Sequence, residues 1–300
     1  MARALIIALA LAATVLSSTS RAAERPLDTA AIEAATGLKG TYNEAEKVFK
    51  VSKPRTDIKP NVDGWVMPPF MGLTSWAAFT PAHGATMLMG DTVLFEDEVN
   101  PAMSAALDAG LEVTALHNHF FFDQPRIYFM HIGGMGDTQR LAKGVKAVYD
   151  RVEQVRAAKA APASTFSGEI PTPNSISAGP IENVFGTKVQ TSDGMAKVVI
   201  GRTAKMHGMT VGNEMGVNTW AAFAGSDDQA VVDGDFSMRE SELQTVLKTM
   251  RAEGINVVAI HQHMTFETPR IMFLHYWGKG KAVDLARSVK KALVAQQTVK

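Results

Sequence analysis

Apolar and polar positions recur in the same order in the two halves of the chain. In each half a helical pattern ends at a glycine and a short, β-branched and apolar run follows, at residues 111–117 and 255–261, which predicts a strand. Each half then closes with an amphipathic helical pattern, at residues 138–155 and 281–295. The recurrence predicts one folding unit that is used twice.

Shorter elements repeat as well. A short helix closed by glycine is predicted at residues 29–37, and alternating strands are predicted at 47–52 and 196–201. Residues 87–95 and 231–238 each have the pattern of a strand, a glycine turn and a second strand. We therefore expect several antiparallel strands in each half.

Two segments align without a gap at an offset of 144 residues, namely 71–79 and 215–223. Each contains one tryptophan, Trp76 or Trp220, inside an apolar stretch. A buried indole supplies a large apolar area. We expect both tryptophans to be core residues.

A helix is predicted before each of the two main strands, at residues 100–109 and 243–252, with Asp97 and Ser241 as N-terminal caps. The acidic run 96–98 could suggest a cation site. Carboxylates in the first turn of a helix also suit its dipole without any ligand. We interpret this run as helix-stabilising.

The pattern of strands, helix, strand, strand and helix in each half predicts the α+β class. We expect two homologous domains, each an antiparallel sheet with helices packed against it, related by internal duplication. An Ala-, Ser-, Gly- and Pro-rich segment separates them and is interpreted as a linker. The predicted division is a signal peptide at 1–23, a first domain at 24–156, the linker at 157–180 and a second domain at 181–300.

The first residues have the composition of a secretory signal peptide: Arg3, an apolar run to Leu16, and small residues up to Ala22 and Ala23. Cleavage near Ala22-Ala23 would leave a periplasmic or secreted protein. Loss of Arg3 and Arg21 leaves 28 basic residues against 30 acidic ones. This balance does not favour a nucleic acid or an anionic membrane as a partner.

The remaining composition sets further limits. An apolar share of 46% over 300 residues is enough for two domains with cores. The chain has no cysteine, which excludes disulfides and thiolate ligands. Since no later apolar run approaches the ~20 residues of a membrane helix, we expect no integral membrane association.

The candidate chemistry lies in residues 115–131 and 259–275, which follow the same pattern. Each copy holds three histidines and one carboxylate at identical spacing, although the residues between them differ. We predict that they are metal ligands. These residues are His117, His119, Asp123 and His131 in the first copy, and His261, His263, Glu267 and His275 in the second.

Strand geometry would bring these side chains together. Residues two apart in a strand point to one face, so His117 and His119 should project together. If the chain folds back as a hairpin centred near Gln124, His131 should lie across from His117. Three imidazoles and a carboxylate suit a divalent transition metal such as Zn, Cu, Ni, Fe or Mn, and could leave one position open. The alternative is that the histidines only support the hairpin.

Other side chains near the histidines could assist such a site. Arg126 and Arg270 each follow a proline that begins the return strand. They could bind a small anionic ligand or hold the loop carboxylate. Neighbouring methionines could serve Cu(I), although such side chains more often fill gaps in a core; they are Met130, Met135, Met264 and Met272.

Several segments resemble the LppY/LpqO family of exported bacterial proteins, whose domain is described mainly as of unknown function. The carrying segments are 71–79, 89–101, 112–119 and 125–134, repeated in part at 220–223 and 260–277. The resemblance covers nearly the whole mature chain, but it implies no established reaction. The lipid-accepting cysteine of the mycobacterial members is absent here, so no lipid anchor is implied. His261, His263 and Glu267 are also similar in order to the HxHxxxE motif of cupins, which we interpret as convergent spacing in a hairpin.

Three functions are compatible with these patterns. The first is an exported two-domain protein that binds or handles metal in the cell envelope. The second is a metal-dependent, hydrolase-type enzyme acting on an envelope component, in which Glu267 or Asp123 could shuttle protons. The third is a structural or interaction module without metal.

Overall fold

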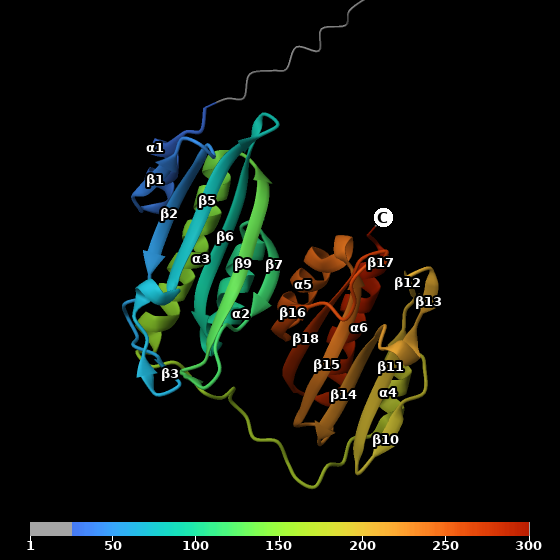
Figure 1. Ribbon diagram of the computed structural model, residues 1–300. Coiled ribbons are helices and arrows are strands. Elements are labelled where there is room, and N and C mark those ends of the chain that lie inside the picture. The colour runs from blue at the N-terminus through green and yellow to red at the C-terminus, as the bar shows by residue number, and fades with distance from the viewer. Residues whose placement is uncertain (1–25, 300) are drawn as a thin grey trace, which may run out of the picture.

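The two halves of the chain each form a six-stranded antiparallel sheet, and in each half helices pack against one face of that sheet (Figure 1). The computed structural model describes residues 26–299. The predicted signal peptide and its cleavage site at Ala22-Ala23 lie outside the described residues. Within them, no helix is both long and apolar enough to span a membrane.

The elements follow the same order in both halves. The first half contains α1 (Thr29–Thr36), β1 (Gly40–Asn43), β2 (Val48–Pro54), β3 (Asn61–Val62), β4 (Trp65–Val66), η1 (Pro69–Met71), β5 (Thr74–Ala82), β6 (Ala85–Phe95), α2 (Glu96–Asp108), β7 (Glu112–His117), β8 (Asp123–Gln124), β9 (Ile127–Gly136) and α3 (Thr138–Ala158). The second half contains α4 (Ala178–Phe185), β10 (Gln190–Ser192), β11 (Met195–Gly201), β12 (Ala204–Met206), β13 (Met209–Val211), η2 (Asn213–Met215), β14 (Asn218–Gly225), β15 (Ala230–Arg239), η3 (Glu240–Glu242), α5 (Leu243–Ala252), β16 (Asn256–His261), β17 (Glu267–Thr268), β18 (Ile271–Gly280) and α6 (Ala282–Gln297).

The two sheets join edge to edge into one sheet of 12 strands, in the order β1-β2-β5-β6-β9-β7-β16-β18-β15-β14-β11-β10. The order is the same when it is read outward from the centre in either direction. β7 and β16 meet there through the antiparallel pair Leu116 and Ile260. Two small sheets, β4-β3-β8 and β13-β12-β17, hold the loops that follow β7 and β16.

Two amide side chains related by the repeat hold the halves together. Asn100 on α2 donates to the carbonyl of Val257 at 3.2 Å and accepts from its N–H at 2.8 Å. Gln244 on α5 makes the same two bonds with Val113, at 2.9 and 3.0 Å. Both valines stand where a β-bulge interrupts the strand pairing. The amides therefore satisfy backbone groups that the sheet leaves free.

The predicted α+β class with two homologous domains is confirmed. The predicted helices at 29–37, 138–155 and 281–295 correspond to α1, α3 and α6. Residues 159–177, between α3 and α4, contain no helix or strand apart from an isolated bridge between Ser175 and Ser226, and the predicted domain bounds stay a prediction.

The prediction of a glycine turn within residues 87–95 and 231–238 is wrong. β6 and β15 run straight through Gly90 and Gly234. A Cβ atom at position 234 would stand 2.2 Å from the Tyr276 ring and 2.4 Å from the carbonyl oxygen of Trp220. The glycine is needed there because a neighbouring side chain crosses the strand closely, not because the chain turns.

The prediction that the two tryptophans are core residues is also wrong. Trp76 and Trp220 are half-buried on the sheet face opposite the helices, because the alternate positions of β5 and β14 point to the core. Lys50 lies 4.4 Å from the Trp76 ring centroid, and Lys197 lies 4.2 Å from that of Trp220. The indoles therefore make cation–π contacts on this face.

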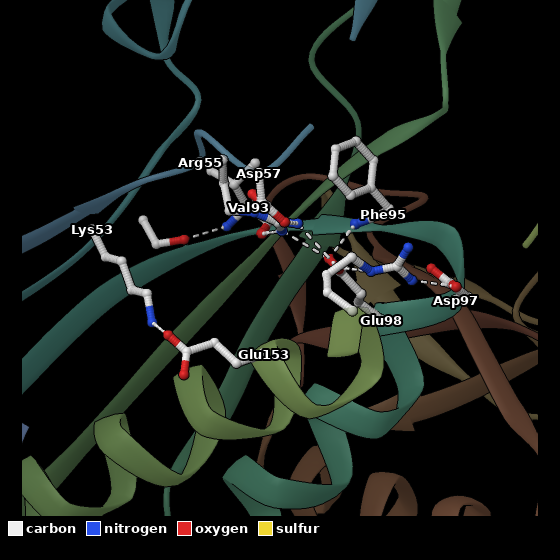
Figure 2. Close-up of polar contacts among 10 residues, drawn as sticks. Lys53, Arg55, Asp57, Val93, Phe95, Asp97, Glu98 and Glu153 are labelled. Carbon is white, nitrogen blue, oxygen red and sulfur yellow. Dashed lines mark hydrogen bonds and ion pairs between the residues drawn. The ribbon is translucent and has the colours of Figure 1, made fainter. Parts of the chain in front are cut away.

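The acidic run at the start of α2 belongs to a buried ion network (Figure 2). Glu98 is fully buried and accepts two hydrogen bonds from Arg55, at 2.7 and 3.0 Å. Arg156 from α3 pairs with both Glu98 and Asp97. Glu98 also accepts from the backbone N–H of Phe95 at 2.9 Å, which caps the helix. Asp97 was predicted to cap the helix but lies inside its first turn, and Glu98 makes the capping contact instead.

Candidate metal centre

Both histidine clusters lie on the open face of the sheet, opposite the helices. In β7 and β16 the residue before each histidine, Leu116 or Ile260, is buried in the main core, so the imidazoles of His117 and His261 point the other way. By the same alternation, the return strands β9 and β18 place His131 and His275 on this face. The local hydrophobic pattern thus sets the direction of the imidazoles.

The predicted register of the hairpin is wrong by two residues. His117 lies opposite Phe129, and His131 lies opposite Ala115. These pairs centre the hairpin at position 123 instead of near Gln124, and a shift of two keeps every side chain on its face. The imidazoles of His117 and His131 therefore still meet diagonally, with their Nε2 atoms 3.0 Å apart.

The second half holds the more tightly assembled cluster. His263 Nε2 lies 3.0 Å from His261 Nε2 and 3.1 Å from Asp235 Oδ2. His261 Nε2 lies 4.0 Å from the same carboxylate oxygen. These three side chains could hold a metal ion together. Ligand atoms about 2.1 Å from a zinc ion are roughly 3.4 Å apart at tetrahedral angles, which is the range of separations found here.

Hydrogen bonds at the far side of two rings fix which nitrogen faces the centre. Nδ1 of His263 lies 3.3 Å from the carbonyl of Gly216, and Nδ1 of His275 lies 3.3 Å from the carbonyl of Gly234. A carbonyl can only accept, so each Nδ1 carries a proton. In the neutral ring, Nε2 then presents a lone pair. Such bonds orient the histidines of metal sites in the same way.

Burial favours the uncharged form of both His261 and Asp235. Burial, together with the charges of His275 and His263, lowers the pKa of His261 to about 4, so this imidazole is neutral near pH 7. Burial raises the pKa of Asp235, although His275 and His263 act against that effect. Asp235 Oδ1 and His261 Nδ1 are buried without a hydrogen-bond partner. Buried polar atoms are rarely left unpaired, but these two are not among the three atoms that converge on the centre.

The first half repeats the arrangement around Asp91. This residue is buried on β6 opposite His131, and burial raises its pKa against the charges of His131, His119 and His117. Its Oδ1 atom also lacks a partner. Burial and the charge of His117 lower the pKa of His119. The first half therefore has the same residue types around a similar centre.

Sequence reasoning missed Asp91 and Asp235. Both stand next to the glycines of the supposed turns and both fall at the offset of 144. The shared offset was the sequence signal that could have identified these two aspartates. The expected turn placed them away from the histidines, whereas a continuous strand pairs Asp235 with His275 and Asp91 with His131.

Two phenylalanines that the sequence did not single out orient the second histidine of each copy. Phe129 stacks on His119 with centroids 3.4 Å apart, and Phe273 stacks on His263 at 3.5 Å. Both phenylalanines are almost completely buried, so they form rigid platforms. The stacking limits rotation of each imidazole.

The structure places the predicted carboxylate ligands in the loops, where they bond to backbone. Asp123 accepts from Ile127 N at 2.6 Å, and Glu267 accepts from Ile271 N at 3.2 Å. Both are buried, and Glu267 Oε2 has no hydrogen-bond partner. Glu267 is not part of the Asp235 cluster. Their role as ligands stays a prediction.

The two arginines differ in their surroundings. Arg126 lies 3.7 Å from Glu96 and is more than half exposed. Arg270 is exposed, and its carbonyl accepts from Glu240 N at 3.1 Å. Anion binding by either arginine stays a prediction.

The two clusters border one surface depression of about 460 Å³ at the junction of β7 and β16. His117 lines it from the first half and His261 from the second. Phe121, Phe122 and Arg126 form part of its wall. Both candidate centres are therefore open to the same volume of solvent.

Comparison with known proteins supports the duplication but supplies no reaction. A family model described as "Domain of Unknown Function (DUF1259)" matches residues 30–151 and 179–295. No curated protein matches the chain.

Two solved structures show weak similarity. One is a trimeric bacterial microcompartment shell protein PduB, with 11% identity, a TM-score of 0.23, and coverage of 86% of this chain and 90% of that one. The other is the double ringed trimeric shell protein MSM0271 from the RMM microcompartment, with 12% identity, a TM-score of 0.21, and coverage of 74% and 86%. TM-scores this low do not establish a shared fold.

Proposed function

For a chain that belongs to the family described as Domain of Unknown Function (DUF1259), we propose metal binding as the function, with a divalent transition metal held by Asp235, His261 and His263. We propose further that the protein is exported and handles this ion in the cell envelope. The signal-peptide pattern and the resemblance to the LppY/LpqO family support export.

One observation carries the metal proposal. Three electron-rich atoms, Asp235 Oδ2, His261 Nε2 and His263 Nε2, converge within 4.0 Å on a half-buried surface. With Nδ1 of His263 donating to Gly216, a neutral His263 ring has no proton to offer the carboxylate. Lone pairs that face one another repel, and a cation between them removes the repulsion. A metal ion satisfies all three atoms at once.

The donor set limits the metal. Two imidazole nitrogens and one carboxylate oxygen are borderline to hard ligands, which suit Zn, Cu(II), Ni, Fe(II) or Mn. Three protein ligands leave room for water or a further ligand. His275 stacks on His261 with centroids 4.6 Å apart and could supply that ligand after a small movement.

The first half is proposed as a second, related centre around Asp91, His117 and His131. Its support is the 3.0 Å contact between the two imidazoles and the buried carboxylate across the strand. Asp123 and Glu267 remain candidates for additional ligands if the loops move.

The test is metal analysis of the full, untagged protein after equilibration with Zn²⁺ and removal of free ions. We expect wild type to retain the metal, and Asp235→Asn or His261→Ala/His263→Ala to retain one equivalent less. The matched control is His83→Asn/His207→Asn, which removes two histidines outside the clusters and should match wild type. Circular dichroism melting checks that each variant is folded.

Two results would overturn the proposal. The first is a wild-type protein that retains no metal after supplementation with Zn²⁺, Cu²⁺, Ni²⁺, Mn²⁺ or Fe²⁺ under anaerobic conditions. The second is a folded Asp235 or His261/His263 variant with the same metal content as wild type.

A further inference from the structure

Three methionine side chains gather on the open face of the first half, outside the Asp235 site. Met87 and Met89 occupy alternate positions of β6, and Met135 lies directly across from Met87 on β9. Their side chains are 38%, 60% and 48% exposed. They line one shallow depression of about 270 Å³ together with His131.

The strand register brings the three sulfur atoms within reach of one another. Directly opposed residues have Cβ atoms about 5 Å apart, and diagonal neighbours about 7–8 Å. Met87 and Met135 are an opposed pair, and Met89 is diagonal to Met135. Gly133 lies opposite Met89 and offers no side chain, so the space above it is open to a thioether. Methionine is flexible enough to close the remaining distance.

His131 borders the same depression. It is two residues from Gly133 on β9 and points to the same face. An imidazole nitrogen at the edge of a group of thioethers makes a mixed sulfur and nitrogen donor set. Glu112 lines the opposite edge and adds negative charge.

These methionines do not have the usual role of filling a core. Met130 and Met272 are buried and have that role, and Met264 packs partly against a smaller apolar cluster. At the exposed positions, the second half carries Val231, Asp233 and Lys279, which lie at the same offset of 144. The fold therefore does not require a thioether there.

We infer that Met87, Met89 and Met135, with His131, form a site for a soft monovalent metal ion of the Cu(I) type. Thioether sulfur is a soft donor that selects Cu(I) over Zn²⁺, and Ag(I) has the same preference. The site goes beyond the proposed function because it takes an ion of a different class through thioether sulfur, and it shares only His131 with the centre proposed around Asp91 in the same half. The two halves would then differ in the metals that they accept.

The experiment uses Ag⁺ as a redox-inert probe on the full-length protein. Titration is followed by the methyl signals of ¹³C-methyl methionine, in wild type and in Met87→Leu/Met89→Leu/Met135→Leu. We expect three methionine signals to shift in wild type and the triple variant to bind one equivalent of Ag⁺ less. Leucine preserves apolar volume, so the triple variant should stay folded.

The control variant is Met209→Leu/Met215→Leu, which removes two exposed methionines of the second half. It should bind Ag⁺ as wild type does. Zn²⁺ retention by the triple variant reports on the Asp235 site separately and should be unchanged. Equal Ag⁺ binding by wild type and the triple variant overturns the inference. It is also overturned if Ag⁺ shifts no methionine signal in wild type while His131→Ala loses Ag⁺ binding, because the ion is then held by the imidazole and not by the thioethers.

Discussion

His263 shows how a single side chain can be prepared to bind an ion. Phe273 stacks on one face of its ring, the Gly216 carbonyl fixes the proton on Nδ1, and Nε2 faces Asp235. Each contact comes from a different part of the chain. Side chains fixed in this way lose little freedom when a ligand binds.

The stacking contact yields a prediction for Phe273→Leu. Loss of the aromatic platform should leave the ring of His263 freer and weaken Zn²⁺ binding by about 10–100-fold, the usual effect of removing a group that orients a metal ligand. Competition with a chelating dye measures the affinity. Phe223→Leu, a buried phenylalanine on β14, is the control and should destabilise the fold without weakening Zn²⁺ binding. Equal affinity in wild type and Phe273→Leu would contradict the role given to the ring.

The histidines could be found from spacing, but the aspartates could not be assigned. A period of two residues predicted His117 beside His119, and their ring centroids lie 5.1 Å apart, although β7 ends at His117 and His119 is already in the loop. Asp235 reaches His263 through the pairing of β15 with β18 and of β18 with β16, which joins residues distant in sequence. A single sequence does not specify such pairings. The error at Gly234 hid the aspartate further, because a turn there would have moved it away.

The same ion-pair arrangement, a glutamate between two arginines, occurs at the start of α2 and of η3. Arg55 and Arg156 surround Glu98, and Arg202 and Arg239 surround Glu242. Each glutamate also accepts a backbone N–H at a helix start. The acidic pattern indicated helix stabilisation. Arg239 is three residues from Glu242, but Arg55, Arg156 and Arg202 come from distant parts of the chain and could not be predicted.

We predict that Glu98→Ala destabilises the protein strongly. Removing one partner of a buried ion pair leaves the other charge buried and typically costs about 3–5 kcal/mol. Chemical denaturation measures the free energy of unfolding. Glu96→Ala, at a neighbouring position whose side chain is 40% exposed, should change it by less than about 0.5 kcal/mol. Similar values for the two variants would show that the network contributes little.

At the level of the whole molecule, the duplication was visible in the sequence but the joined sheet was not. Each half shows its own strands and helices by pattern. The contact between β7 and β16 is a single backbone pair, and Asn100 and Gln244 complete it from the helices. A polar residue on an amphipathic helix is ordinarily exposed, so the sequence offered no reason to place these two amides at an interface.

We expect Asn100→Leu and Gln244→Leu to destabilise the junction by similar amounts. Each leaves one N–H and one C=O of a valine backbone without a partner, and each buried group left unpaired costs about 1–3 kcal/mol. Thermal unfolding followed by circular dichroism measures the change. Gln154→Leu on the exposed face of α3 is the control and should melt like wild type. Unchanged melting of both junction variants would contradict the account of how the halves are joined.

Metal binding by Asp235, His261 and His263 can be tested directly in a crystal of the protein grown with Zn²⁺ and measured at the zinc absorption edge. We predict an anomalous peak about 2.0–2.2 Å from Asp235 Oδ2, His261 Nε2 and His263 Nε2. We also predict that the peak is absent from crystals of Asp235→Asn grown in the same way. A map without a peak between these three atoms, or a peak that persists unchanged in Asp235→Asn, would contradict metal binding by these residues.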